Sequence, residues 1–428
     1  MLRPYSNGLE VDVADLKSRI EAANAEALDI LLSSRPVWVD VRPALEVVPG
    51  MTENTVMHSA PPIEWTRMCG PHRNGIIGAV LFEGLAETPE AAQQLIEEGG
   101  VVISPCHHHD SVGAGTGITT ASMPMVVVEN APHGVRAYSN VFESGSLEGI
   151  KWGNYNQEIA GHLRWEAEVL GPVLQAALQE MDGLDVRSII AKAVQMGDEC
   201  HNRSVAASSI FFRELSPYLI RVAEGDVLLE CAEFLAKAEH FMLHTIMAAA
   251  KSMVLAIEGI DYSTVVTTMA RNGVEFGIRV SGLGDDWFTA PANPVEGLYF
   301  RSEWGPEDAV LDLGDSCITE TVGLGGFIQP AAPTVQQYVQ GSLEQAFQNT
   351  AEMREICVGT NDEVQIPTLD FAGAPIGIDI RKVVQTGIAP LIDTAITHQE
   401  AGLIGAGEVR APKACFEKAL KAFVAQYA

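Results

Sequence analysis

The hydrophobic period of the chain changes twice, and this pattern constrains the fold more than any other feature of the sequence. Residues 155–259 are poor in glycine and repeat apolar side chains at helical spacing, as in DVRSIIAKAVQM and in the long run VLLECAEFLAKAEHFMLHTIMAAAKSMVLAI. On both sides of this region, runs rich in β-branched residues alternate with glycine-rich turns. The sequence therefore predicts an α/β protein with α+β character, in which two mixed α/β domains flank a helical domain.

The places where the period changes give the predicted domain boundaries. The predicted parts are an N-terminal helical segment (1–34), an α/β domain with a loop rich in His and Gly (35–154), a helical domain (155–260) and a second α/β domain with glycine-rich loops (261–428). With 428 residues, of which 47% are hydrophobic, the chain is long enough to bury several cores.

Single elements inside the two α/β parts follow from residue type. Residues 35–48 begin with a strand-like run, and residues 90–99 indicate a helix. Residues 101–105 and 123–130 indicate two further strands. Residues 263–292 are expected to form three strands joined by turns at RNG and GLGDD, because Asn-Gly between β-rich runs is a strong hairpin signal.

The chain is strongly acidic. Lys and Arg total 27 against 56 Asp and Glu, which gives a formal net charge of -29. This charge repels nucleic acids and anionic membrane surfaces, so neither is an expected partner. It also repels a small anionic substrate at long range. A site for such a substrate must therefore gather arginine side chains or backbone N–H groups locally.

Several features indicate a cytoplasmic protein. The seven cysteines are scattered and form no C-x-x-C pair, which fits free thiols in a reducing compartment. The N-terminus carries Glu10 and Asp12 where a secretory signal needs an apolar core. The most apolar long segment, residues 240–260, contains Lys251 and Glu258 and is therefore expected to be a core helix and not a membrane span.

Potential chemistry is densest in residues 104–120, which read SPCHHHDSVGAGTGITT. Imidazole groups can transfer protons or donate hydrogen bonds to a carbonyl. Gly113, Gly115 and Gly117 would let backbone N–H groups close on an anion, since glycine has no Cβ. Histidine tracts also occur in solvated loops, and glycine marks ordinary turns. The local pattern leaves both interpretations open.

Three arginines lie beside glycine: Arg271 in ARNG, Arg279 in GIRVSGLG and Arg381 in GIDIRKVVQTG. A guanidinium next to backbone N–H groups can hold a carboxylate or a phosphate through its planar fork. The alternative for each is an ordinary surface ion pair. Further along the chain, the hydroxyl groups of Ser316 and Thr319 in GDSCITE are expected to cap a following helix, a role also open to Asp315 and Glu320.

No metal or cofactor is predicted. Residues 107–110 are chemically capable metal ligands, and so are Asp198, Glu199 and His201, but neither spacing is diagnostic. The sequence has no P-loop and no complete dinucleotide-binding motif, which leaves nucleotide binding unsupported. It also lacks a G-x-S-x-G elbow, so a serine hydrolase is not indicated.

Taken in order, eight segments resemble the YlbE/AllG-like family, whose genes accompany FdrA-type proteins. The segments are RPVWVDVRP, HSAPPIEW, GPHRNGIIGAVLFEGLA, PCHHHDSVGAGTGITTASMPMVVVEN, MGDECHNR, RNGVEFGIRVSGLGDDWFTAP, GDSCITETVGLGG and IGIDIRKVVQTGIAPLIDTAITHQEAGLIGAG. The resemblance implies two α/β domains and one helical domain. It also implies a component of oxamate carbamoyltransferase, from anaerobic allantoin degradation in purine catabolism, which works with an FdrA-like subunit and a third small protein.

The implied reaction converts oxalurate and phosphate into oxamate and carbamoyl phosphate. Its substrates are anions, and negative charge grows on the carbamoyl oxygen in the transition state. We therefore expect His107 or His108 to polarise the carbonyl or to move the proton of the nitrogen. Phosphate is assigned to donors of the glycine-rich turn: Gly113, Gly115, Gly117 and Thr119.

Arginine side chains are expected to complete this site. Arg279, helped by Arg271, would neutralise the phosphate, and Arg381 would form a fork with the substrate carboxylate. Two other functions remain open from the sequence. The chain could be a non-catalytic partner of an FdrA-like subunit, with its loops forming an interface. It could also be a metal-dependent amidohydrolase of ureido acids.

Overall fold

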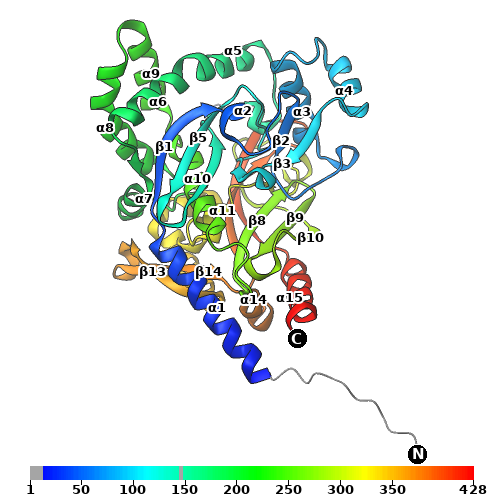
Figure 1. Cartoon of the computed structure of the whole chain (residues 1–428), viewed down its shortest axis with the longest axis vertical. Coiled ribbons are helices and arrows are strands. Elements are labelled where there is room, and N and C mark those ends of the chain that lie inside the picture. Colours follow the sequence, from blue (N-terminus) through cyan, green and yellow to red (C-terminus); the bar gives the residue numbers. More distant parts are fainter. Residues whose placement is uncertain (1–12, 144–147) are drawn as a thin grey trace, which may run out of the picture.

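A computed structural model of the chain describes residues 13–143 and 148–428. Residues 1–12, the start of the predicted N-terminal segment, lie outside the described residues. The rest of that segment forms helix α1 (Val13–Ser33), which Figure 1 shows projecting at the end of the molecule where the C-terminus also lies. Asn24 ties α1 to a distant part of the chain, because its buried side-chain amide donates to Thr264 Oγ1 at 2.8 Å.

A mixed five-stranded sheet follows, with the order β4-β6-β5-β1-β7. Its strands are β1 (Pro36–Pro43), β4 (Ser111–Val112), β5 (Pro124–Asn130), β6 (Val135–Asn140) and β7 (Leu184–Asp185). Helix α2 (Ala44–Val47) continues directly from β1. The strands predicted at the start of 35–48 and at 123–130 are confirmed, and they pair antiparallel from Pro36 with Asn130 to Pro43 with Pro124.

Two short parallel strands form a separate sheet: β2 (Thr55–His58) and β3 (Val102–Pro105). The connection between them contains helices α3 (Gly70–Phe82) and α4 (Pro89–Glu97), so the predicted helix at 90–99 and strand at 101–105 are confirmed. Thr88 caps α4 by accepting a hydrogen bond from the Ala91 N–H. Because the strands are parallel, His58 lies beside Pro105, and both strands end at the same edge.

The predicted helical region is helical, with β7 as a short interruption that joins the five-stranded sheet. Its helices are α5 (Gln157–Trp165), α6 (Gly171–Glu180), α7 (Val186–Gln195), α8 (Val205–Val222), α9 (Gly225–Lys237) and α10 (Met242–Leu255). Figure 1 shows α6, α8 and α9 together at the upper left, on the side of β1. Helix α10 packs against β5 and β6 and is buried along most of its length, as expected for a core helix.

Strands return after α10, as predicted. The order β10-β9-β8-β12 forms a four-stranded sheet from β8 (Val266–Asn272), β9 (Glu275–Val280), β10 (Phe288–Pro291) and β12 (Leu313–Gly314). The three-stranded prediction for 263–292 is confirmed, since β8, β9 and β10 pair antiparallel in sequence. Gly273 adopts φ +77° in the RNG turn, and Asn272 Oδ1 accepts hydrogen bonds from the Val274 and Glu275 N–H groups.

The remaining C-terminal elements surround this sheet. The strands are β11 (Glu296–Tyr299), β15 (Leu391–Thr397) and β16 (Leu403–Arg410) in one sheet, and β13 (Cys357–Ile366) and β14 (Ala372–Ile378) in another. The helices are α11 (Ile318–Thr321), α12 (Gln336–Val339), α13 (Leu343–Ile356), α14 (Ile380–Thr386) and α15 (Lys413–Tyr427). The mixture of sheets and helices confirms the predicted α/β class with α+β character.

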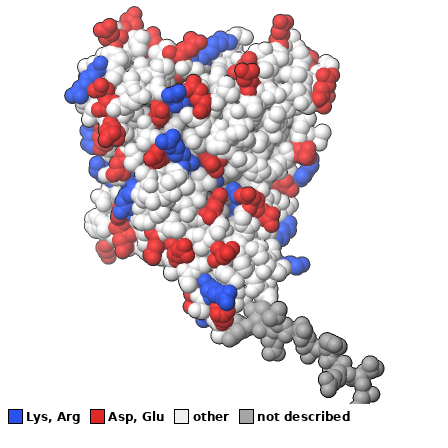
Figure 2. Space-filling model, in the orientation of Figure 1, with Lys and Arg blue, Asp and Glu red and all other residues white. Residues whose placement is uncertain are grey.

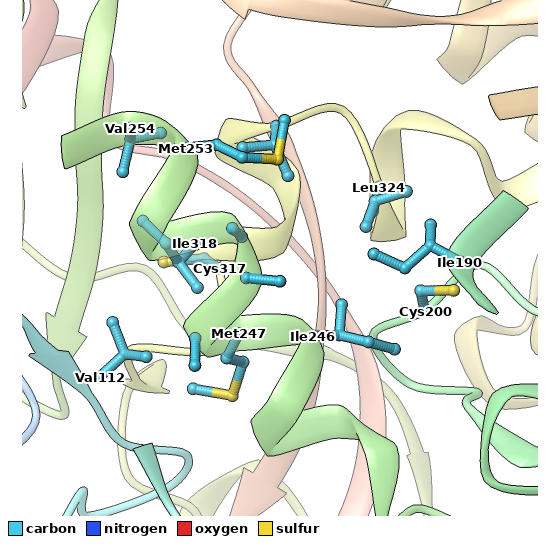
Figure 3. Packing of buried hydrophobic residues seen from close by; sticks show 14 of the residues in the cluster. Val112, Ile190, Cys200, Ile246, Met247, Met253, Val254, Cys317, Ile318 and Leu324 are labelled. Atoms are coloured by element: carbon cyan, nitrogen blue, oxygen red, sulfur yellow. The ribbon is translucent and has the colours of Figure 1, made fainter. Parts of the chain in front are cut away.

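The largest hydrophobic core joins parts of the chain that are far apart in sequence. It contains buried residues of α1, β1, α6 to α10, β8, β9 and α15. Figure 3 shows Met247 and Val254 of α10 within this core, close to Cys317 and Ile318. A smaller core lies under α3 and α4 and includes Val56, Ile76 and Ile96. The predicted boundaries at 154/155 and 260/261 stay a prediction.

The surface reflects the acidic composition. Figure 2 shows Asp and Glu side chains spread over the visible face, with Lys and Arg interspersed among them. Across residues 13–143 and 148–428, each helix is too short or too polar to cross a bilayer.

Candidate active site

The candidate site begins at the edge where the parallel strands β2 and β3 both end. In open α/β sheets, ligands bind at the carboxyl ends of parallel strands. His58 is the last residue of β2, and the chain after β3 turns into a 3-10 helix, Cys106–His109, which carries the three consecutive histidines. Burial lowers the pKa of His58 to about 4, with a smaller contribution from nearby His108. The two strand ends thus bring histidines from separate segments together.

His107 and Asp315 form the centre of the site. The two side chains are fully buried, and His107 Nε2 lies 3.7 Å from Asp315 Oδ1. Neither ring nitrogen of His107 has a hydrogen-bond partner among the described residues. Burial lowers the pKa of His107 well below its usual value, helped by the charges of Lys251 and Arg279. The imidazole is therefore neutral at physiological pH and carries an unpaired lone pair.

Asp315 is held in place by backbone groups from two loops. Its Oδ1 accepts from the Ala60 N–H at 2.8 Å, and its Oδ2 accepts from the Gly113 N–H at 3.1 Å. Burial nevertheless raises the pKa of Asp315 to about 7. The carboxyl group is thus close to half protonated at neutral pH, where it can stabilise a positive charge on the facing imidazole.

Two cations lie beside this pair. Lys251 Nζ of α10 is 3.4 Å from Glu258 Oε1, and Arg279 Nη1 of β9 is 3.3 Å from the same oxygen. The side chains of Lys251 and Arg279 are 0% and 4% exposed. Arg279 also pairs with Asp285, whose side chain is 97% exposed. In a chain with a net charge of -29, these two buried cations are groups that an anionic substrate can bind, and in this structure Glu258 and Asp285 pair with them.

The loop between β9 and β10 covers the site. Its Asp285 contacts Arg279, and its Trp287 donates from Nε1 to His108 Nε2 at 3.1 Å. The Trp287 ring also meets the edge of the His107 ring, with centroids 5.9 Å apart. Since His108 Nε2 accepts a hydrogen bond, the proton of the neutral ring sits on Nδ1. The sequence left His107 and His108 equivalent, and the structure gives them different surroundings.

His109 is used differently from its two neighbours. Its Nδ1 lies 2.6 Å from the Pro49 carbonyl oxygen, and its Nε2 lies 2.8 Å from Ser104 Oγ. With both ring nitrogens engaged by the protein, His109 fixes the short helix that presents His107 and His108.

The glycine-rich turn packs against protein backbone. Gly113 donates to Asp315, and the Gly117 N–H donates to the Ala114 carbonyl at 3.0 Å. Thr119 Oγ1 donates to the Gly117 carbonyl at 3.3 Å. Gly115 has φ +58°, and a Cβ there would overlap the Lys151 carbonyl oxygen. These contacts favour a structural use of the turn, which places His107 against Asp315.

Arg271 lies behind the site and fixes the loop that carries Asp315. It is fully buried, and its Nε is 2.9 Å from Asp312 Oδ1. Its Nη1 donates to the Gly314 carbonyl at 2.7 Å and to Ser316 Oγ at 3.1 Å, so it holds both neighbours of Asp315. Arg271 is therefore a positioning residue in this geometry.

The capping role predicted for the GDSCITE segment is wrong. Cys317 is the N-cap of α11, and no side chain caps that helix. Ser316 accepts from Arg271, while Thr319 Oγ1 donates to the Ser316 carbonyl at 2.8 Å. Glu320 belongs to a second, buried polar cluster, in which its Oε1 lies 2.7 Å from His201 Nδ1.

The structure does not bring Arg381 into contact with the other predicted site residues. It lies on α14, which Figure 1 shows near the C-terminal end of the molecule, and its guanidinium pairs with Asp379 at 2.7 Å. The candidate metal ligands Glu199 and His201 contact each other, with Glu199 accepting from the His201 N–H at 2.6 Å. Within 13–143 and 148–428, no group of three or more His, Cys, Asp and Glu side chains is arranged to hold a metal ion.

Sequence reasoning missed several residues of this site, among them Lys251, Asp315 and His58. Lys251 stands alone in the apolar run AAAKSMV, and a single lysine inside a core helix is the one signal that pointed to it. Asp315 was assigned to helix capping. His58 carries no local signal, because only the parallel pairing of β2 with β3 brings it close to His108.

Comparisons with known proteins identify relatives that match nearly the whole chain. A family model described as oxamate carbamoyltransferase subunit AllG matches residues 101–316. Oxamate carbamoyltransferase subunit AllG of Escherichia coli (strain K12) is 45% identical over 409 residues, which cover 94% of this chain and 97% of that protein. Uncharacterized protein YahG of the same strain is 44% identical over 421 residues, which cover 97% of this chain and 89% of that protein.

A solved structure has the same fold. The crystal structure of a conserved protein of unknown function from Enterococcus faecalis V583 superposes with a TM-score of 0.94 at 42% identity, covering 96% of this chain and 99% of that one. The segment matched by the family model, 101–316, contains His107, Lys251, Arg279 and Asp315.

Proposed function

Because this chain belongs to the AllG family of oxamate carbamoyltransferase subunits, we propose that it is itself a subunit of such an enzyme and carries part of its active site. The enzyme would move a carbamoyl group between oxalurate and phosphate, giving oxamate and carbamoyl phosphate in purine catabolism through allantoin. An FdrA-like protein and a third small protein would complete the complex in the cytoplasm.

The proposed reaction sets clear demands on a site. Phosphate attacks the carbamoyl carbon, so that a C–O bond forms and the bond from this carbon to the oxamate nitrogen breaks. The proton of hydrogen phosphate ends on that nitrogen, so one group can take it and return it. Meanwhile negative charge grows on the carbamoyl oxygen, and a hydrogen-bond donor is needed to stabilise it. The site must therefore combine a proton carrier, a donor and cations.

One observation carries the proposal: a neutral, buried His107 lies 3.7 Å from Asp315 and beside two buried cations. His107 would accept the phosphate proton and pass it to the departing nitrogen, while ionised Asp315 stabilises the imidazolium formed between these steps. His108 would donate from Nδ1 to the carbamoyl oxygen, since Trp287 occupies its Nε2.

The other predicted residues take roles that follow from their contacts. We propose that Arg279 contacts phosphate directly and that Arg271 acts through the loop of Asp315. Gly113, Gly115, Gly117 and Thr119 would shape the wall that presents His107. Arg381 already pairs with Asp379, so its proposed fork with the substrate carboxylate has the least support.

Carbamoyl phosphate formation from oxalurate and phosphate tests the proposal, measured with this chain alone and with its partner subunits. His107→Asn should lower kcat by roughly 10²- to 10⁴-fold, the usual contribution of a general acid–base. His133→Asn is the matched control, because His133 lies at the β5–β6 turn and contacts Ser33 Oγ at 3.1 Å, outside the site. Its kcat should match the wild type.

Two results would contradict the proposal in different ways. If no mixture forms carbamoyl phosphate from oxalurate, the reaction is wrong. If a complex turns oxalurate over and His107→Asn leaves kcat intact, the chemistry lies on another subunit and this chain is a non-catalytic partner.

A further inference from the structure

Lys251 is fully buried in the middle of α10, between apolar neighbours such as Ala250 and Met253 (Figure 3 shows Met253 in the core). Lysine is almost never fully buried unless its charge is compensated. Among the described residues, Glu258 supplies the carboxylate within 4 Å of Lys251 Nζ, and the Glu258 side chain is 24% exposed. The carboxylate in direct contact with this buried charge is therefore partly solvated.

Arg279 contacts the same carboxylate as Lys251. Its Nη1 lies 3.3 Å from the Glu258 oxygen that Lys251 contacts, and its other carboxylate partner, Asp285, is almost fully exposed. Exposed ion pairs contribute little, because water already solvates the carboxylate. Within 4 Å, the two buried cations thus contact one partly buried carboxylate and one solvated carboxylate, while Asp110 interacts with both cations, and Asp315 with Lys251, from further away. Both carboxylates are accessible to solvent, whereas the two cations are buried.

We infer that Lys251 and Arg279 form the subsite for the phosphoryl group, whose oxygens replace Glu258 and Asp285 on the two cations. The identity of the anion rests on the proposed function, whereas the arrangement of the cations does not. The exposed Asp285 is displaced first, which opens Arg279 to the incoming anion. The ion pair between Glu258 and Lys251 then breaks, and a phosphate oxygen takes the place of the carboxylate.

The chemistry of the two cations suits a phosphoryl group. An arginine fork binds two oxygens in one plane, and a lysine ammonium acts as a point charge on a third. The subsite also lies close to the proton carrier, since the charges of Lys251 and Arg279 both act on the His107 ring. A phosphate bound there would have its oxygens near His107, as attack on the carbamoyl carbon requires.

Binding of inorganic phosphate to the full-length chain, measured by calorimetry without turnover, tests the inference. Lys251→Met should weaken phosphate binding by roughly 30-fold or more, because one partner of a buried charge contact is removed. Methionine fills the same space without charge, so the helix should keep its packing. Lys151→Met is the matched control, since Lys151 is 4% exposed and its Nζ donates to the Glu143 carbonyl at 2.6 Å. Its phosphate affinity should equal that of the wild type.

A second variant shifts the affinity in the opposite direction. Glu258→Gln removes the carboxylate that competes with phosphate for both cations, and should tighten phosphate binding by roughly three- to tenfold. A misfolded variant cannot produce tighter binding, so this result separates the subsite from a purely structural role of Lys251.

Three results with phosphate overturn the inference: no phosphate binding by the wild-type chain, an unchanged affinity in Lys251→Met, or weaker binding in Glu258→Gln. Oxamate serves as a second probe. If Lys251→Met loses oxamate binding and keeps phosphate binding, the cations hold a carboxylate and the inference is also wrong. If phosphate binding follows the expected pattern while no mixture converts oxalurate, the subsite stands and the proposed reaction fails.

Discussion

The carboxyl group of Asp315 lies in surroundings that favour its neutral form at the centre of the candidate site. Burial raises its pKa to about 7, against the opposing effects of the Ala60 and Gly113 N–H groups and of Arg271. Arg271 also hydrogen-bonds to both neighbours of Asp315, which keeps the carboxyl group from turning outward. Burying this carboxyl group therefore costs folding free energy once the group ionises, and that cost depends on pH.

The sign of this dependence follows from the raised pKa. Between about pH 4, where an unfolded aspartate ionises, and about pH 7, folded Asp315 keeps its proton and the unfolded chain loses it. The contribution of Asp315 to wild-type stability should therefore fall as pH rises through this window, by up to about 1.4 kcal/mol per pH unit. Asp315→Asn cannot titrate. Its free energy of unfolding minus that of the wild type should rise from pH 4 to 7 and level off above, as measured by urea denaturation.

Taking the difference between the two free energies of unfolding cancels the contributions of the other titrating groups, so this difference reports on Asp315. A difference that stays flat from pH 4 to 7 would show that the folded pKa is not raised. A constant offset is expected in addition, because the amide of asparagine cannot accept from both the Ala60 and Gly113 N–H groups.

Single residues of the site were predictable only where the local sequence already shows unusual chemistry. His107 stands in a histidine tract and Arg279 stands beside glycine. In the structure the charge of Arg279 acts on His107, and so does that of Lys251, which contacts the same Glu258 oxygen as Arg279. Lys251 and Asp315 were not predicted as site residues, because their importance depends on which distant segments face them. No local pattern records that α10 and the loop after β12 meet at His107.

Among the elements, the glycine-rich turn between β4 and β5 shows how the same residues serve two different uses. Glycine can leave backbone N–H groups free to bind an anion. It can also be required because a neighbouring segment leaves no space for a Cβ. The Thr116 N–H donates to the Lys151 carbonyl at 2.8 Å, and the Gly115 Cα lies against that same segment. The turn is thus the contact between the β2–β3 edge and the segment at residues 150–152.

A matched pair of substitutions distinguishes the effect of steric overlap from the effect of backbone strain. Gly115 and Gly134 have φ +58° and +67°, so alanine suffers similar strain at both, roughly 1–2 kcal/mol. A Cβ at Gly134 meets nothing within 4 Å, but at Gly115 it would overlap the Lys151 carbonyl. Gly115→Ala should therefore lower the free energy of unfolding by about 1–3 kcal/mol more than Gly134→Ala. Equal losses, measured by urea denaturation, would mean that the turn is open and available to a ligand.

Predictions of elements succeeded where the signal is local. The RNG turn, the helix at 90–99 and the strand at 123–130 all follow from neighbouring residues, because turn residues and side-chain period act over a few positions. The parallel pairing of β2 with β3 spans two helices and was not predicted. The capping prediction for Ser316 failed because a buried arginine from β8 competes for the same hydroxyl group.

For the molecule as a whole, the hydrophobic cores bear on how the chain divides into domains. The largest core contains residues of the predicted helical domain, such as Met247, and residues of the predicted second α/β domain, such as Met269 of β8. Helix α10 contacts both β5 and β8. The core under α3 and α4 is separate and smaller. A domain with its own core can unfold alone, whereas parts that share a core unfold together.

Hydrogen exchange of the native protein can test this division. Backbone amides of α10 and β8 should exchange with the same free energy of opening, equal to that of global unfolding, because breaking either one exposes the shared core. Amides of α3 and α4 should open at lower free energy, since their smaller core can separate while the rest stays folded. If α10 opened well before β8, the predicted boundary at 260/261 would also be a boundary of stability. In that case Lys251 and Arg279, which lie on either side of it, would separate when the helical part opens, and the phosphate subsite would depend on the docking of two domains.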